Sequence, residues 1–215
     1  GSLGRTEATG FGVICVLREA LKKLNIDVTK TTASFQGFGN VSQHAVRSYQ
    51  QLGGKVIAVS CWDNNDKASY TFKKADGLDV DALLNITDSF GCIDKVKARE
   101  LGYEVLPGDA WIEQDVDILI PAAMENQIRS DNVHKISSQV KVLCEAANGP
   151  TTPDADKVLN ERKIFVIPDF LSNAGGGTCS FLEQVQCNMN YFWDKAEVLE
   201  KLEYGMTKAF RAVYR

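Results

Sequence analysis

Residues 35–42 read FQGFGNVS, in which two glycines separated by one residue follow an apolar stretch. Gly37 and Gly39 match the first two glycines of the dinucleotide-binding pattern G-x-G-x-x-G, while Ser42 stands where the third small residue belongs. The first glycine allows a tight turn from strand to helix, and the second lets the backbone approach a pyrophosphate at the N-terminus of the helix. The third serves close helix packing, so we expect Ser42 to affect packing and not the phosphate contact.

The segments on either side of this loop complete a strand, turn, helix and strand. TTASFQ (31–36) is β-prone, and the apolar positions of VSQHAVRSYQQLGG (41–54) fall on one helical face. KVIAVS (55–60) is a nearly uninterrupted apolar run, which is typical of a strand buried on both faces of a parallel sheet. Because this context supports the glycine pattern, we favour dinucleotide binding over the alternative, a glycine turn without a ligand.

The rest of the chain alternates helical and strand patterns. A helix is expected at 8–25 with Asn25 as its stop signal, and two more at about 178–192 and 195–213. Between them we expect helices near 79–86, 93–101 and 153–162, and strands at 116–122, 140–146 and 164–168. This predicts an α/β fold with a Rossmann-like, doubly wound, mostly parallel sheet and flanking N-terminal and C-terminal helices. We expect one dinucleotide-binding domain over 1–215, helical from about 176 to 215.

Composition narrows the possible partners. The formal net charge of -4 provides no general basic surface, so nucleic acid is not expected as a partner. No apolar run approaches the roughly 18 residues needed to span a bilayer, and no export signal is visible, so we expect a cytoplasmic protein without a membrane partner. The six cysteines form no CxxC pair, so we expect no metal site and interpret them as reduced thiols that fill core space.

An acid that binds the adenosine ribose is expected about 20 residues after the glycine loop. Asp63 follows the second strand, and its carboxylate would accept hydrogen bonds from the ribose and repel a 2'-phosphate. This predicts NAD as the cofactor, with Trp62 shaping the adenine side. Asp63 lies slightly beyond the usual place and Lys67 is near, so a solvated loop aspartate is the alternative and NADP remains possible.

Three further stretches occur in order with FQGFGNVS and IPAAMENQI (120–128). They are GSLGRTEATGFGV (1–13), CEAANGPTTPDAD (144–156) and PDFLSNAGGGTCSFLE (168–183). Together these motifs closely resemble the C-terminal, NAD(P)-binding domain of hexameric glutamate dehydrogenases, which share a family with leucine, phenylalanine and valine dehydrogenases. The resemblance implies a homo-hexameric enzyme for the reversible oxidative deamination of L-glutamate to 2-oxoglutarate and ammonia.

The resemblance also implies roles for individual residues. Thr9 would meet the nicotinamide carboxamide, Asn148 the nicotinamide ribose, and Asn173 the cleft beside nicotinamide and substrate. The alternatives are a Thr9 that only caps or packs in its helix and asparagines that only form turns. The complete set expected to bind the cofactor is Thr9, Gly37, Phe38, Gly39, Asn40, Val41, Trp62, Asp63, Ala122, Ala123, Asn148 and Asn173.

Two residues are expected at the substrate. Arg5 would lie near a substrate carboxylate, and Ser180 matches the family serine that binds the γ-carboxylate of glutamate. An apolar residue at that position would suit the leucine, phenylalanine and valine enzymes, because a buried hydroxyl without a partner costs about 1–3 kcal/mol. Ser180 therefore favours glutamate, with a purely structural serine as the alternative. Ser42 and SCWDNNDKASYTF (60–72) depart from the family's usual residues and leave the coenzyme preference open.

The resemblance places no catalytic residue in this chain. In the family, a lysine and an aspartate of a preceding substrate domain transfer the protons. The chain opens at Gly1 without methionine and ends within a helical pattern, so we expect a fragment that lacks that domain and has no activity by itself. The alternatives are the same domain of another amino-acid dehydrogenase, or a non-catalytic dinucleotide-binding partner or sensor.

Overall fold

The computed structural model describes residues 1–215, and its centre is a seven-stranded sheet in the order β4-β3-β2-β1-β5-β6-β7. The strands are β1 (Thr32–Gln36), β2 (Lys55–Asp63), β3 (Ala68–Lys73), β4 (Glu104–Pro107), β5 (Ile118–Pro121), β6 (Val142–Cys144) and β7 (Phe165–Ile167). The pairs β2/β1, β1/β5, β5/β6 and β6/β7 are parallel, whereas β3 is antiparallel to β2 and β4. The predicted doubly wound, mostly parallel sheet is confirmed.

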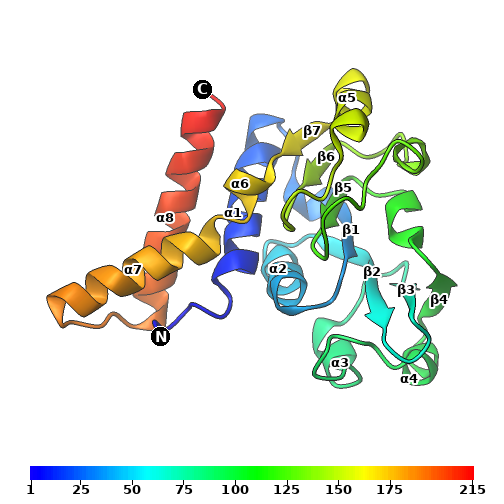
Figure 1. Cartoon of the computed structure of the whole chain (residues 1–215), viewed down its shortest axis with the longest axis horizontal. Helices are drawn as coiled ribbons and strands as arrows, with labels where there is room; N and C mark the ends of the chain where they lie inside the picture. The colour runs from blue at the N-terminus through cyan, green and yellow to red at the C-terminus, as the bar shows by residue number, and fades with distance from the viewer.

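Eight α-helices flank this sheet (Figure 1). They are α1 (Ala8–Lys23), α2 (Asn40–Gln51), α3 (Val80–Leu84), α4 (Lys95–Glu100), α5 (Pro153–Glu161), α6 (Asp169–Ser172), α7 (Gly175–Met189) and α8 (Lys195–Val213). Three short 3-10 helices, η1 (Val28–Lys30), η2 (Ala110–Glu113) and η3 (Val133–Lys135), lie in the connections. None of the helices is both long and apolar enough to cross a bilayer.

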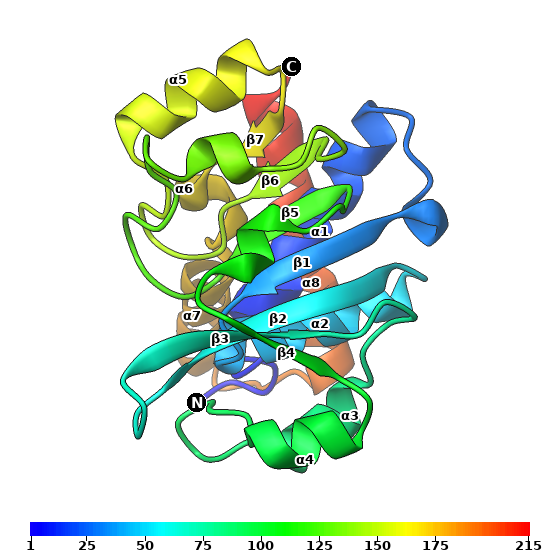
Figure 2. The same cartoon turned by 90° about the vertical axis from the view of Figure 1, so that its right-hand side faces the viewer.

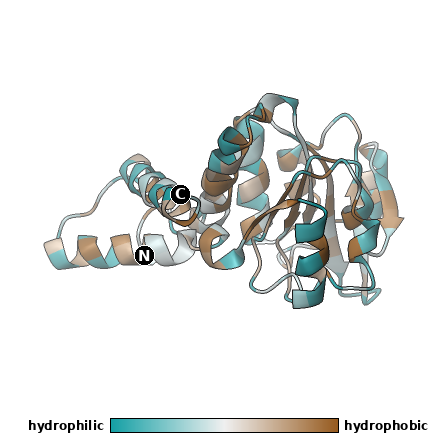
Figure 3. Ribbon diagram, turned by 90° about the horizontal axis from the view of Figure 1, so that it is seen from above, coloured by the Kyte–Doolittle hydropathy of each residue, from teal (hydrophilic) through white to brown (hydrophobic).

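The two faces of the sheet bury separate apolar clusters. The larger cluster joins the sheet to α1, α2 and α8, which lie behind the strands in Figure 2. The smaller cluster packs η2, η3 and α5 against the opposite face. The strands form the brown interior in Figure 3, while α7 extends away from them. This layering accounts for the uninterrupted apolar runs of the strands, because both of their faces are covered.

A hairpin corrects the expected strand pattern. The second strand was expected to end at residue 60, but β2 continues to Asp63 because that residue pairs with Ala68 at the start of β3. The turn between them places Lys67 at φ 51°, in the left-handed region. β3 and β4 were both missed, since neither is an apolar run of the kind that marks a fully buried strand.

The cysteines follow the expectation only in part. Cys15, Cys61, Cys144 and Cys179 are buried free thiols, as expected. Cys187 is exposed and Cys92 is half-buried, so the interpretation of all six as core-filling residues was wrong for these two. Cys187 lies on α7, which extends away from the sheet, and Cys92 lies in the connection between α3 and α4.

Glycines bring the first and last parts of the chain together. A Cβ on Gly10 would lie 2.5 Å from the Val41 carbonyl oxygen, and one on Gly175 would lie 2.3 Å from the Ala8 carbonyl oxygen. Side chains at these positions would collide with backbone, so α1 approaches both α2 and α7 more closely than larger residues permit. The N-terminus of α1 is thereby held between the glycine loop and the start of α7.

Candidate functional site

The predicted residues gather at the carboxyl ends of the central strands. β1 lies between β2 and β5, so the order in which the strands are added to the sheet reverses beside it, and ligands of such sheets bind at this kind of switch point. A cavity of about 410 Å³ lies there between the loops. Its lining consists of Arg5, Thr9, Val41, Ala122, Ala123, Ala146, Ala147, Asn148, Asn173, Gly176 and Gly177. Seven of these were predicted, and they come from five separate parts of the sequence.

The glycine loop has the geometry that a pyrophosphate requires. Gly37 has φ 86°, and a Cβ there would lie 3.0 Å from the Ala122 carbonyl oxygen, so the turn needs glycine. Its amide donates to Ser60 Oγ over 3.1 Å. Gly39 caps the N-terminus of α2, without a side-chain capping bond, and a Cβ there would point into open space. A phosphate can therefore approach the N–H groups that begin α2.

The other residues of the loop serve mainly through their backbone. Phe38 is buried in the core, and its carbonyl oxygen accepts from Gln43 Nε2 over 2.7 Å. Asn40 Nδ2 donates to the Thr6 carbonyl oxygen over 2.8 Å, which ties α2 to the segment before α1. Ser42 is completely buried, and its hydroxyl has no hydrogen-bond partner. The irregular third position of the pattern thus carries the cost of an unpaired buried hydroxyl and does not touch the open side of the loop.

The two predicted substrate residues are in contact. Arg5 Nε donates to Ser180 Oγ over 3.2 Å, and Ser180 Oγ donates to the Gly176 carbonyl oxygen over 3.0 Å. A Cβ on Gly176 would lie 2.7 Å from Thr9 Oγ1, so Thr9 also contacts the start of α7. Residues from both ends of the chain therefore form one wall of the site.

The predicted asparagines also meet. Asn173 Nδ2 donates to Asn148 Oδ1 over 2.7 Å. Asn148 lies in the loop after β6, and Asn173 is the C-terminal cap of α6, which follows β7. Both residues line the cavity. Asn148 Nδ2 has no hydrogen-bond partner within the chain and remains available as a donor there.

Asp63 lies apart from this cavity, at the end of β2. Its Oδ1 accepts from the amides of Asn65 and Asp66, and its Oδ2 accepts from Lys95 Nζ over 2.6 Å. The hydrogen bond from Lys95, aided by those backbone amides, lowers the pKa of Asp63 to about 2. The carboxylate is thus ionised and already paired. Trp62 beside it is exposed.

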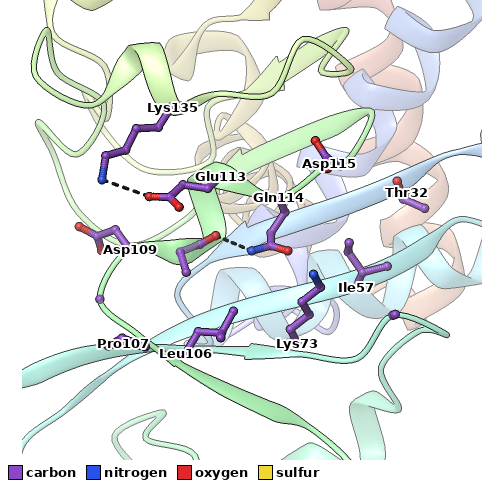
Figure 4. Close-up of a pocket in the computed structure, with 13 residues that line it drawn as sticks. Thr32, Ile57, Lys73, Leu106, Pro107, Asp109, Glu113, Gln114, Asp115 and Lys135 are labelled. Atoms are coloured by element: carbon purple, nitrogen blue, oxygen red, sulfur yellow. Dashed lines mark hydrogen bonds and ion pairs between the residues drawn. The ribbon is translucent and has the colours of Figure 1, made fainter.

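A larger cavity of about 830 Å³ lies at the opposite, amino ends of the parallel strands (Figure 4). Thr32, the first residue of β1, lines it together with residues of η2 and the turn before it. Lys135 and Glu113 form an ion pair of 3.1 Å on its wall. None of the residues predicted to bind cofactor or substrate lines this cavity.

Several residues of the candidate site were missed by the sequence analysis. Ala146, Ala147, Gly176 and Gly177 line the cavity, and each directly adjoins or lies within a motif used for the prediction. Glu145 and Asp169, which hydrogen-bond behind the asparagines, were also missed. Their place in CEAANGP and PDFLSN was the available signal, but their partners depend on how two distant loops meet.

The whole chain is similar to known proteins of one family. The family described as Glutamate/Leucine/Phenylalanine/Valine dehydrogenase matches residues 1–215. The NAD-specific glutamate dehydrogenase of Clostridioides difficile is 44% identical over 216 residues, covering 100% of this chain and 49% of that protein. The crystal structure of glutamate dehydrogenase from Peptoniphilus asaccharolyticus matches with a TM-score of 0.80 and 39% identity, over 100% of this chain and 47% of that one.

A third comparison extends the likeness to a more distant protein. The hetero-hexameric glutamate dehydrogenase of Thermus thermophilus, in its leucine-bound form, matches with a TM-score of 0.87 and 28% identity. The match covers 100% of this chain and 48% of that one. The chain therefore spans about half the length of the proteins that it matches.

Proposed function

The chain belongs to the glutamate/leucine/phenylalanine/valine dehydrogenase family, and we propose that it is the coenzyme-binding part of an NAD-dependent glutamate dehydrogenase. The observation that carries this proposal is the single cavity at the switch point, where Thr9, Asn148 and Asn173 lie beside the glycine loop. The Clostridioides difficile relative, which is named an NAD-specific glutamate dehydrogenase, supports both the coenzyme and the substrate. Residues 1–215 act in this proposal as one dinucleotide-binding domain.

The residues present fit a dinucleotide. Gly37 and Gly39 and the N-terminus of α2 would hold the pyrophosphate, because a Cβ on Gly39 meets nothing within 4 Å. Trp62 and Asp63 at the end of β2 would hold the adenosine, and Thr9 and the two asparagines would hold the nicotinamide end. A bound NAD would supply the hydride acceptor for oxidation at the substrate α-carbon. The chain's own groups orient it and form one wall that excludes water.

The substrate in this proposal is L-glutamate, which is converted reversibly to 2-oxoglutarate and ammonia. Arg5 lies near a substrate carboxylate, and Ser180 reorients its hydroxyl from the Gly176 carbonyl oxygen to the γ-carboxylate. The proton-transfer lysine and aspartate come from a preceding substrate domain, and the complete enzyme is a homo-hexamer. Hexameric assembly is supported by the name of the Thermus thermophilus protein and the chain's likeness to it.

Binding of NADH to the purified chain tests the proposal. We expect saturable binding, followed by calorimetry, that is lost or at least tenfold weaker in Gly39→Val, because the new side chain fills the open space over the loop. Gly205→Ala, in α8, is the control and should bind as the unchanged protein does. The chain alone should give no turnover of glutamate. Absence of NADH binding, or equal binding by Gly39→Val, would refute the proposal.

A further inference from the structure

Two carboxylates link the loops that follow β6 and β7. The amide of Asp169 donates to Glu145 Oε2 over 3.0 Å, and the amide of Gly149 donates to Asp169 Oδ2 over 2.8 Å. Each loop thus gives one donor to the other and takes one from it. Glu145 is nearly buried, with 8% of its surface exposed, so its hydrogen bond is shielded from competing water.

These bonds join the two loops beyond the point where the pairing of their strands ends. The pairing of β6 with β7 ends with the amide of Glu145 donating to the Ile167 carbonyl oxygen over 3.0 Å. On its other side, the β6 loop is held by backbone, because the amides of Ala146 and Ala147 both donate to Pro121. Toward β7, beyond the strands, the two carboxylates and the asparagine pair supply the hydrogen bonds between the loops, next to the buried contact of Cys144 Sγ with Ser172 Oγ over 3.1 Å.

Asp169 is placed to control both asparagines. The residue that donates to its carboxylate, Gly149, directly follows Asn148. The carbonyl oxygen of Asp169 accepts from the amide of Asn173 over 2.9 Å, across the single turn of α6. A displacement of Asp169 would therefore move the two ends of the bond between Asn148 Oδ1 and Asn173 Nδ2.

We propose that Glu145 and Asp169 are positioning residues that hold Asn148 and Asn173 in the geometry that receives the nicotinamide riboside end of the dinucleotide. Because Asn148 Oδ1 accepts from Asn173 Nδ2, the orientation of the Asn148 amide is set, and its Nδ2 keeps its hydrogens for a ligand in the cavity. This inference rests on the proposed function, since it requires the riboside to bind in this cavity. Neither carboxylate is among the residues that line the cavity, so they act through the asparagines.

The affinities for two ligands, NADH and ADP, distinguish a role in positioning the asparagines from a general contribution to folding. NADH carries the nicotinamide riboside, whereas ADP carries only the part that would bind at the glycine loop and the end of β2. We expect Asp169→Ala to raise the Kd for NADH about tenfold and to leave the Kd for ADP within about twofold. Asp169→Asn keeps one oxygen that can accept from the Gly149 amide, so it should recover part of the NADH affinity.

The same comparison applies to the second carboxylate. Glu145→Gln keeps an oxygen acceptor for the Asp169 amide and should bind NADH nearly as the unchanged chain does, whereas Glu145→Ala should bind it several-fold more weakly. Asp154→Ala removes an exposed carboxylate on α5 and serves as the control without effect on either ligand.

Three results would overturn the inference. NADH affinity that is unchanged in both Asp169→Ala and Glu145→Ala would show that the carboxylates do not position the asparagines. Equal weakening of NADH and ADP would show that they only support the fold. If the unchanged chain binds ADP but gains no affinity from the nicotinamide riboside of NADH, the riboside does not use this cavity; binding of neither ligand would refute the proposed function itself.

Discussion

Arg5 Nε donates a hydrogen bond to Ser180 Oγ over 3.2 Å, although 175 positions separate the two residues along the chain. Arg5 precedes α1, and Ser180 lies in the second turn of α7. Their contact depends on glycines, since a Cβ on Gly175 would lie 2.3 Å from the Ala8 carbonyl oxygen and push the two helices apart. The wall that we propose for the substrate is therefore built by the close crossing of α1 and α7.

Ser180 is expected to select glutamate in the complete enzyme. Ser180→Ala removes the hydroxyl proposed for the γ-carboxylate, and the loss of a hydrogen bond to a charged group, worth about 1.5–3 kcal/mol, predicts roughly a 10- to 100-fold lower kcat/KM for glutamate. Steady-state kinetics with glutamate and leucine provide the test. Thr178→Ala is the control, because Thr178 also donates to a carbonyl oxygen four residues earlier but has no bond to Arg5. Equal effects of the two substitutions would contradict the role of Ser180.

Asp63 is expected to disfavour NADP. Asp63→Asn removes its charge while keeping an oxygen for the amides of Asn65 and Asp66, so the ratio of the Kd values for NADPH and NADH should fall severalfold. Asp66→Asn removes a second carboxylate that also contacts Lys95, and it should leave the ratio unchanged. If both variants shift the ratio alike, only the net charge matters and Asp63 has no specific contact with the ribose.

Glu145 is expected to make stability depend on pH. Burial, together with the carboxylates of Asp169 and Asp156, raises its pKa above the ordinary value of 4.5, although hydrogen bonds partly oppose this. Because the pKa of Glu145 is higher in the folded than in the unfolded chain, protonated Glu145 contributes to the free energy of unfolding. This contribution is fully present below the unfolded-state pKa and is lost as the pH rises through the folded-state pKa. Urea unfolding should therefore show Glu145→Gln to be more stable than the unchanged chain at about pH 8, with the difference disappearing toward about pH 4. A difference that grows toward low pH would contradict this.

The glycines at the start of α7 give a matched pair for stability. Gly175→Ala would place its methyl group against the Ala8 carbonyl oxygen, so we expect a loss of more than about 2 kcal/mol in the free energy of unfolding. Gly177→Ala meets nothing within 4 Å and should be neutral or stabilising by about 1 kcal/mol through helix propensity. Thermal and urea unfolding measure both. Similar stabilities of the two variants would show that α1 and α7 can separate without cost.

The parallel strands could be predicted from the sequence, because an uninterrupted apolar run indicates a strand that is buried on both faces of the sheet. The hairpin of β2 with β3 was harder to predict, since β3 is only half-buried, follows a polar turn and depends on pairing with β2 for its extended form. Gly37 was recognisable because its positive φ demands glycine. The ion pair of Asp63 with Lys95 was not, because it depends on where α4 packs, 32 residues later in the chain.

A map of NADH binding on the purified chain tests the central claim most directly. In an NMR titration of backbone and asparagine side-chain amides, we predict saturable shifts at Gly37, Gly39, Thr9, Asn148 and Asn173, which the structure gathers at the carboxyl ends of the strands. Shifts confined to the cavity around Thr32 and Lys135 at the opposite ends of the strands, or the absence of saturable shifts, would contradict the account.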